Sequence, residues 1–188
     1  MSVPQQTMSG KEEVKNIDLS ALSQGMPGIT STHGQMLAEA AAVCLESQQH
    51  EPGVRFPKVG LMPEDMKVGW RPADDQQRRC YADMHEATEW GASAVAILMI
   101  NEVTGKSVIE RSKKGTGFDY WIGDNDLGAL PFEGVARLEV SGILRGAKGQ
   151  IEARVKQKKN QIEPTDHLAP GFVAIVEFGS PIACVEDK

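Results

Sequence analysis

The stretch that decides the fold of this chain is Ile109–Gly142, which reads IERSKKGTGFDYWIGDNDLGALPFEGVARLEVSG. It contains strand-like runs separated by turns rich in glycine. Two acidic residues, Asp119 and Glu139, stand among the apolar residues of these runs. A charge at such a position needs a partner or a function, because burying an unpaired charge is costly.

Residues 135–143 alternate between apolar and polar side chains, as a strand with two different faces does. The apolar face, which we expect to cover the core, carries Ala136, Leu138 and Val140. The other face, which we expect to point to solvent or into a site, carries Val135, Arg137, Glu139 and Ser141.

Residues 117–122 form a second alternating run, with Asp119 and Trp121 on one face and, on the other, Phe118, Tyr120 and Ile122. If the two strands are neighbours, Asp119 and Glu139 lie close together on one face. Two nearby carboxylates repel each other unless a proton or a cation lies between them. Oxygen ligands of this kind suit Mg2+ or Mn2+, so the pair predicts a divalent-metal site.

The composition limits the class of protein. The chain has 188 residues, enough for one domain with a core, and its net charge of −6 excludes a generally basic nucleic-acid binder. Its three cysteines form no Cys-x-x-Cys pair, so we expect no structural zinc site. We see no signal peptide, and the longest apolar run, Ala92–Ile100, is too short to span a bilayer. We therefore expect a cytoplasmic protein without a membrane segment.

Outside the central stretch, the pattern divides the chain into two parts. Residues 1–34 are polar and show no sustained period, which predicts a flexible or loosely docked arm. Residues 35–188 read as a single α/β domain. The expected elements are a helix over 35–49, a short strand over 54–56, a long helix from Asp74 or Asp75 to Val103, strands over 107–112, 117–122 and 135–143, a basic helix over 148–161, and strands over 172–178 and after Pro181. The strand over 172–178 is apolar on both faces, which is typical of a central or parallel strand.

From residue 74 to about residue 180, the expected order is helix, strand, strand, strand, helix, strand. Together with Gly115-Thr116-Gly117-Phe118-Asp119 and Glu139-Val140-Ser141, this order resembles the PD-(D/E)XK nuclease superfamily, the restriction-endonuclease-like fold. The resemblance implies an α/β restriction-endonuclease-like core with an extra N-terminal helix, and metal-dependent hydrolysis of DNA or RNA, in an active or a degenerate form.

The resemblance also implies roles for individual residues. Asp119, Glu139 and the backbone carbonyl of Val140 would bind Mg2+ or Mn2+, with Glu89 or Glu86 assisting from the long helix. The family places a catalytic residue, usually Lys, two positions after the Glu, and this chain has Ser141 there. The family also moves that Lys onto the following helix, where Lys158 is available beside Gln161.

Nucleic-acid binding would use a local basic patch in an acidic protein. The candidate residues flank the expected strands or lie on the basic helix: Lys113, Lys114, Arg145, Lys148 and Lys156.

Each of these features has a plainer interpretation. Asp119 could simply end a turn or pair with a nearby Lys or Arg. Glu139 could lie on a solvated sheet face and pair with Arg137 or with a Lys on a neighbouring strand. The lysine-rich helix could be an ordinary solvated helix, and the tryptophans could be packing residues. A second hypothesis is therefore a non-enzymatic subunit that assembles with itself or with a protein partner, consistent with Ser141 and the polar N-terminal segment. A third is a small-molecule-binding domain, because a fold does not fix a function.

Overall fold

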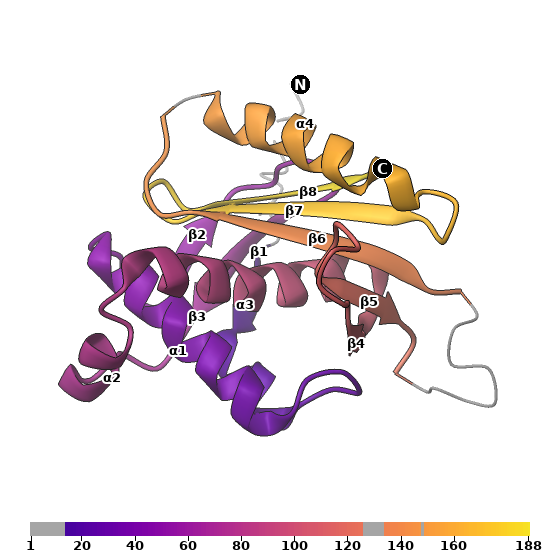
Figure 1. The fold of residues 1–188 in the computed structure, drawn as a ribbon. Helices are drawn as coiled ribbons and strands as arrows, with labels where there is room; N and C mark the ends of the chain where they lie inside the picture. The colour runs from indigo at the N-terminus through magenta and orange to yellow at the C-terminus, as the bar shows by residue number, and fades with distance from the viewer. Residues whose placement is uncertain (1–13, 126–133, 148) are drawn as a thin grey trace, which may run out of the picture.

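The computed structural model describes residues 14–125, 134–147 and 149–188. It is a mixed α/β structure with two β-sheets (Figure 1). In chain order the elements are β1 (Val14–Asp18), the 3-10 helix η1 (Leu19–Gln24), α1 (Ser31–Ser47), β2 (Val54–Phe56), β3 (Asp65–Gly69), α2 (Asp75–Cys80), α3 (Met84–Thr104), β4 (Ser107–Arg111), β5 (Tyr120–Gly123), β6 (Ala136–Ile143), α4 (Gln150–Ile162), the 3-10 helix η2 (Glu163–Thr165), β7 (Gly171–Glu177) and β8 (Ile182–Asp187).

The larger sheet has the strand order β4-β5-β6-β7-β8. All neighbours are antiparallel except β6 and β7, which run parallel. Helix α4 lies on one face, and α3 lies on the other with α1 packed against it (Figure 1). The predicted strand over 172–178 is therefore confirmed as central and parallel to a neighbour, and the strand predicted after Pro181 is confirmed as β8.

The two faces of the sheet belong to two hydrophobic clusters. Ala136, Leu138 and Val140 face the main core, which contains the buried sides of α1 and α3. The predicted apolar face of β6 is thus confirmed. A smaller cluster lies under α4 and includes Val155 and Ile162 from that helix.

Phe118 lies on the opposite face from the one we predicted. It packs in the cluster under α4, where its ring meets that of Trp121 edge to face at 4.9 Å between centroids. Tyr120 and Ile122 face the main core as predicted. The alternation fails at Phe118 because Gly117 has a φ of +87° and the regular strand begins only at Tyr120.

The predicted long helix is two helices, so the prediction of one continuous helix was wrong. Asp74 caps α2, as predicted, and α2 ends at Cys80. The Asp83 carboxylate then accepts hydrogen bonds from the backbone N–H groups of His85 and Glu86 and starts α3. This second N-cap restarts the helix because it satisfies two N–H groups that a helix start leaves unpaired. Gly105 ends α3 in a left-handed conformation, as predicted.

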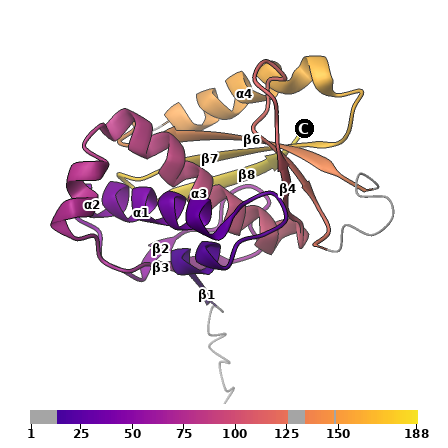
Figure 2. The ribbon, with the colours of Figure 1, turned by 60° about the horizontal axis from the view of Figure 1, so that its bottom comes forward.

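The segment from Val14 to Gly34 differs from the predicted arm, because it belongs to the folded structure. β1 pairs in parallel with β3 in a small sheet ordered β1-β3-β2, beside α1 (Figures 1 and 2). Leu19 and Leu22 of η1 are fully buried. Local periodicity did not reveal β1 or β3, because each is short and becomes a strand by pairing with distant residues. Residues 1–13 lie outside the described part.

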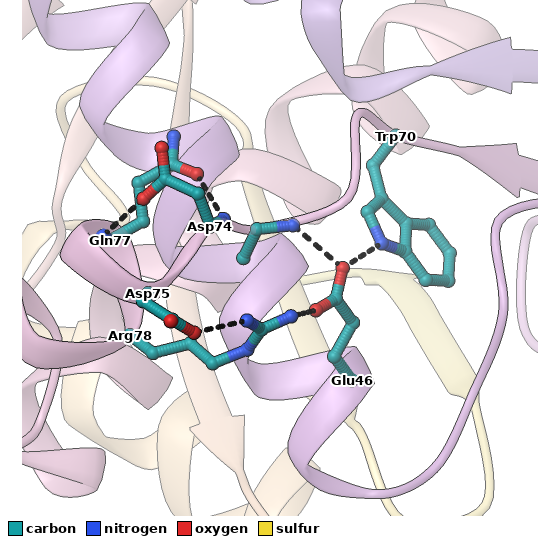
Figure 3. Close-up of polar contacts among 7 residues, drawn as sticks. Glu46, Trp70, Asp74, Asp75, Gln77 and Arg78 are labelled. Carbon is teal, nitrogen blue, oxygen red and sulfur yellow. Dashed lines mark hydrogen bonds and ion pairs between the residues drawn. The ribbon is translucent and has the colours of Figure 1, made fainter.

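Glu46 connects the end of α1 to the segment that leads into α2 (Figure 3). One oxygen of its carboxylate accepts hydrogen bonds from Trp70 Nε1 at 3.1 Å and from the Ala73 backbone N–H at 2.8 Å. The other oxygen accepts from Arg78 Nη2 of α2 at 2.9 Å. A single carboxylate thus holds α1, α2 and the intervening loop together.

We predict that Glu46→Ala lowers the free energy of unfolding by about 2 kcal/mol, because it leaves partly buried donors without their charged acceptor. Chemical denaturation with urea measures the change. Glu51→Ala, which removes an exposed carboxylate just after α1, should change stability by less than about 0.5 kcal/mol. Equal effects of the two substitutions would contradict the role assigned to Glu46.

Candidate active site

The site forms where β5 and β6 separate. The two strands pair only from Ile122–Ala136 to Tyr120–Leu138. Beyond that point β6 keeps its parallel partner β7, but its other edge is no longer covered by β5. Asp119 lies at this edge: its backbone N–H donates to the Leu138 carbonyl at 3.0 Å, and its carboxylate accepts from the Val140 N–H at 2.8 Å.

The alternation of a strand turns the N–H and C=O groups of one residue toward the same edge. The Val140 carbonyl therefore faces the same open edge as the N–H group that Asp119 accepts from. The Asp119 carboxylate and the Val140 backbone carbonyl therefore both lie at the edge of β6 that β5 leaves uncovered.

Glu139 lies on the α4 face of β6 and is 2% exposed. Its Oε1 accepts hydrogen bonds from Lys158 Nζ at 2.6 Å and from Gln161 Nε2 at 2.9 Å. Gln161 Nε2 also donates to the Gly117 carbonyl at 2.9 Å. Two side chains of α4 therefore hold the Glu139 carboxylate, and one of them also ties α4 to the turn before Asp119.

The two carboxylates predicted to lie close together do so. The pKa of Glu139 is raised to about 7, first because the group is buried and second because the negative charge of Asp119 is close. The hydrogen bond and positive charge of Lys158 oppose this rise in the pKa. Burial of a carboxylate beside a second carboxylate makes the site favourable for a proton or a cation.

Ser141, two positions after Glu139, also faces α4. Its Oγ accepts a hydrogen bond from Arg154 Nη1 at 2.9 Å. α4 thus places one cation beside each of the two polar β6 side chains, Lys158 beside Glu139 and Arg154 beside Ser141.

Arg137 anchors the end of α4 and so fixes these contacts. Its side chain is 1% exposed and donates to the carbonyls of Ala169 and Ile162 at 2.8 and 2.9 Å. It also donates to Thr165 Oγ1 at 2.6 Å and Asp166 Oδ1 at 2.9 Å. Arg137 therefore does not pair with Glu139, which was one of the alternatives that the sequence left open; the lysine that does pair with Glu139 comes from α4 and not from a neighbouring strand. Its four acceptors hold the C-terminal end of α4 against β6.

Two cavities meet at the carboxylates. The first has a volume of about 560 Å³ and lies between α1, α3, α4 and the open edge of β6. The second has a volume of about 610 Å³ and lies against the turn between β4 and β5. Both cavities are lined by Arg111, Asp119, Glu139 and Gln161.

The remaining residues predicted for the site are distributed unevenly around these cavities. Glu89 lines the first cavity but is exposed, with its carboxylate 3.9 Å from His85 Nδ1. Lys113 and Lys114 line the second. Arg145 and Lys156 are exposed and are not among the residues that line either cavity, and Lys148 lies outside the described residues.

Among the described residues, no three His, Cys, Asp or Glu side chains gather as a metal-binding group. The structure therefore does not bring Glu89 together with Asp119 and Glu139 as the predicted third carboxylate.

Sequence reasoning missed two residues of the first cavity, His33 and Arg111. His33 comes from the first turn of α1, and burial together with the nearby charge of Arg111 lowers its pKa. No local pattern indicates that His33 lines the same cavity as Asp119, because the two residues are far apart in the chain.

No protein-family model matches this chain, and comparisons with curated proteins and with solved structures also give no match. Within the described ranges, no helix has the length and apolar character needed to cross a membrane.

We predict that the pKa of Glu139 makes stability depend on pH in metal-free buffer. A folded-state pKa of about 7, above the ordinary 4.5, means that the folded state holds its proton longer than the unfolded state does. The free energy of unfolding should therefore fall as pH rises from about 4.5 to about 7. Glu139→Gln should remove this fall, so its stability relative to wild type should increase across that interval.

Urea denaturation in EDTA at several pH values between 4.5 and 8 measures this difference. Glu163→Gln replaces an exposed carboxylate just after α4 and should leave the shape of the wild-type profile unchanged. A Glu139→Gln profile parallel to that of wild type would contradict the assignment.

Proposed function

We propose that this chain is a metal-dependent nuclease of the PD-(D/E)XK type, which hydrolyses phosphodiester bonds in DNA or RNA. The order from α3 to β7 supports the proposal, because it is helix, three strands, helix, strand, with β6 and β7 parallel. The same order of elements underlies the resemblance of the sequence to that superfamily. The observation that carries the proposal is the convergence of Asp119, Glu139 and Lys158 at the open edge of β6.

The residues present fit a divalent metal ion. Asp119 and Glu139 offer carboxylate oxygens, and the Val140 carbonyl faces the same edge, which is the oxygen ligand set that Mg2+ and Mn2+ prefer. Burial raises the pKa of Glu139 first and the negative charge of Asp119 raises it second, so a cation bound beside both carboxylates would stabilise their ionised forms. Mg2+ commonly takes only one or two carboxylates and completes its shell with water and phosphate oxygens. When bound, the metal would lower the pKa of a water molecule and offset charge on the phosphate.

Lys158 takes the place of the lysine that the motif lacks at position 141. It reaches Glu139 Oε1 from α4 at 2.6 Å, so its ammonium group lies at the carboxylate pair. There it can orient the attacking water and stabilise the negative charge that builds on the phosphate oxygens. In hydrolysis, the water oxygen forms a bond to phosphorus and gives up one proton, the bond from phosphorus to the leaving oxygen breaks, and the leaving oxygen takes up one proton.

The non-enzymatic alternative has an observation in its favour. Lys158 and Glu139 form an ion pair, so each charge has a partner within the chain and needs no ligand. A site that serves only to stabilise the fold would have such an internal pair. The two proposals differ in whether the carboxylates bind a metal ion and whether Lys158 affects a reaction or only stability.

We predict that the wild-type protein binds Mn2+ in isothermal titration calorimetry and that Asp119→Asn and Glu139→Gln lose this binding. Lys158→Ala should keep Mn2+ binding, because Lys158 is not a ligand, but should lower the rate of nucleic-acid cleavage by about 100- to 1,000-fold. Lys158→Arg, which keeps the positive charge, should recover part of that rate.

Lys67→Ala, which removes an exposed lysine from β3, serves as the charge-matched control and should affect neither measurement. Circular dichroism confirms that each variant is folded. If folded wild-type protein binds no Mn2+ and cleaves no nucleic acid, the nuclease proposal is wrong and the non-enzymatic alternative is favoured.

A further inference from the structure

A third cavity lies between η1, α1, the segment that follows β3, and α2. It shares no lining residue with the two cavities at the carboxylate pair. Its volume is about 240 Å³, below the roughly 300 Å³ at which pockets for drug-sized ligands begin. A molecule of about the size of a single amino acid therefore fits this cavity better than a larger ligand does.

Two opposite charges line the third cavity without pairing with each other. Arg71 is exposed and forms neither a salt bridge nor a hydrogen bond within the described part of the chain. Glu39 of α1 is partly buried, and its partners among the described residues are neutral. Its Oε1 accepts a hydrogen bond from Gln35 Nε2 at 3.0 Å, and its Oε2 accepts from the Tyr81 hydroxyl at 3.2 Å. A carboxylate has about four acceptor positions, so Glu39 can accept further hydrogen bonds from a ligand.

The groups around these charges are already held in place. The indole N–H of Trp70, a buried residue of the cavity wall, donates to Glu46 at 3.1 Å (Figure 3). Gln77 lines the opposite end of the same wall sequence, on α2, and its Oε1 accepts from the Asp74 backbone N–H at 2.9 Å. The amide nitrogen of Gln77 has no acceptor within the described ranges, so it can donate to a ligand. Walls that are fixed before binding reduce the ordering entropy that a ligand has to overcome.

The charges limit the kind of ligand that the third cavity can take. A plain anion is attracted by Arg71 but repelled by Glu39, and a plain cation meets the reverse. An uncharged apolar molecule would remove water from both charged groups and give neither of them a partner, which is costly. A small molecule that carries one positive and one negative group compensates both charges.

From this geometry we propose that the third cavity binds a free α-amino acid in its zwitterionic form. The guanidinium group of Arg71 pairs with the α-carboxylate, because its N–H groups match the two oxygens of a carboxylate. The Gln77 amide donates to the same carboxylate, and Glu39 accepts from the α-ammonium group. Ser20 and Ser23 of η1 also line the cavity, which favours a ligand with a short or polar side chain. The proposal goes beyond the nuclease function and does not depend on it, since it involves neither metal nor nucleic acid.

The first test measures thermal unfolding of the full chain with each proteinogenic amino acid, added singly in millimolar excess. We expect at least one of them to raise the Tm, because a ligand that binds only the folded state stabilises it. Isothermal titration calorimetry then compares that amino acid with its N-acetyl derivative, which lacks the ammonium group, and with its carboxamide, which lacks the carboxylate. Each derivative should bind at least about tenfold more weakly, since each loses a charged hydrogen-bond partner. Failure of every amino acid to bind, or equal binding of either derivative, would overturn the proposal.

The second test locates the binding site with variants. Arg71→Gln and Glu39→Gln should each weaken binding of the same amino acid by about 10- to 100-fold. Glu39→Gln keeps an oxygen that can accept from Gln35 and Tyr81, so it tests the charge and not the packing.

The control variants are Arg79→Gln, which removes an exposed arginine of α2 that does not line the cavity, and Glu51→Gln, which removes an exposed carboxylate just after α1. Both should bind the amino acid like wild type. Circular dichroism confirms that all four variants are folded. Unchanged affinity in folded Arg71→Gln or Glu39→Gln would show that the amino acid binds elsewhere, and the assignment to the third cavity would be wrong.

Discussion

The partial pairing of β5 with β6 is the constraint on which the candidate site depends. The two strands separate on the N-terminal side of Tyr120, where β5 begins. They separate there because the chain turns at Gly117, whose φ is +87°. A side chain is excluded there, since a Cβ at Gly117 would lie 2.9 Å from the Gln161 carbonyl oxygen. The separation leaves an uncovered strand edge, and the Asp119 carboxylate covers its first free N–H group at Val140.

The buried charge at Glu139 depends on a second constraint, the anchoring of α4. Taking a carboxylate out of water costs several kcal/mol, and a buried ion pair repays that cost only with good geometry and further hydrogen bonds. Lys158 and Gln161 supply those bonds, and the four acceptors of Arg137 hold the helix end from which they extend. The main core supplies the stability that allows these polar groups to be buried.

The N-terminal third of the chain completes the site from the other side. α1 packs closely on α3 at Gly91, where a Cβ would lie 2.9 Å from the Ala41 Cα atom. This contact brings His33, in the first turn of α1, to the wall of the first cavity. The segment that the sequence indicated as an arm thus leads into a helix whose position shapes the site.

The sequence alone determined the local features. The period-two pattern of residues 135–143 assigned the core face of β6, and the out-of-place charges identified Asp119 and Glu139, because side-chain alternation and the cost of burying charge are local properties. The tertiary structure decided the rest: the break between α2 and α3, the strands β1 and β3, the position of Phe118, and the approach of Lys158, Arg154 and His33 to the carboxylates. These features depend on contacts between residues far apart in the chain, and no periodicity within one segment specifies which distant side chain will satisfy a buried charge or an open strand edge.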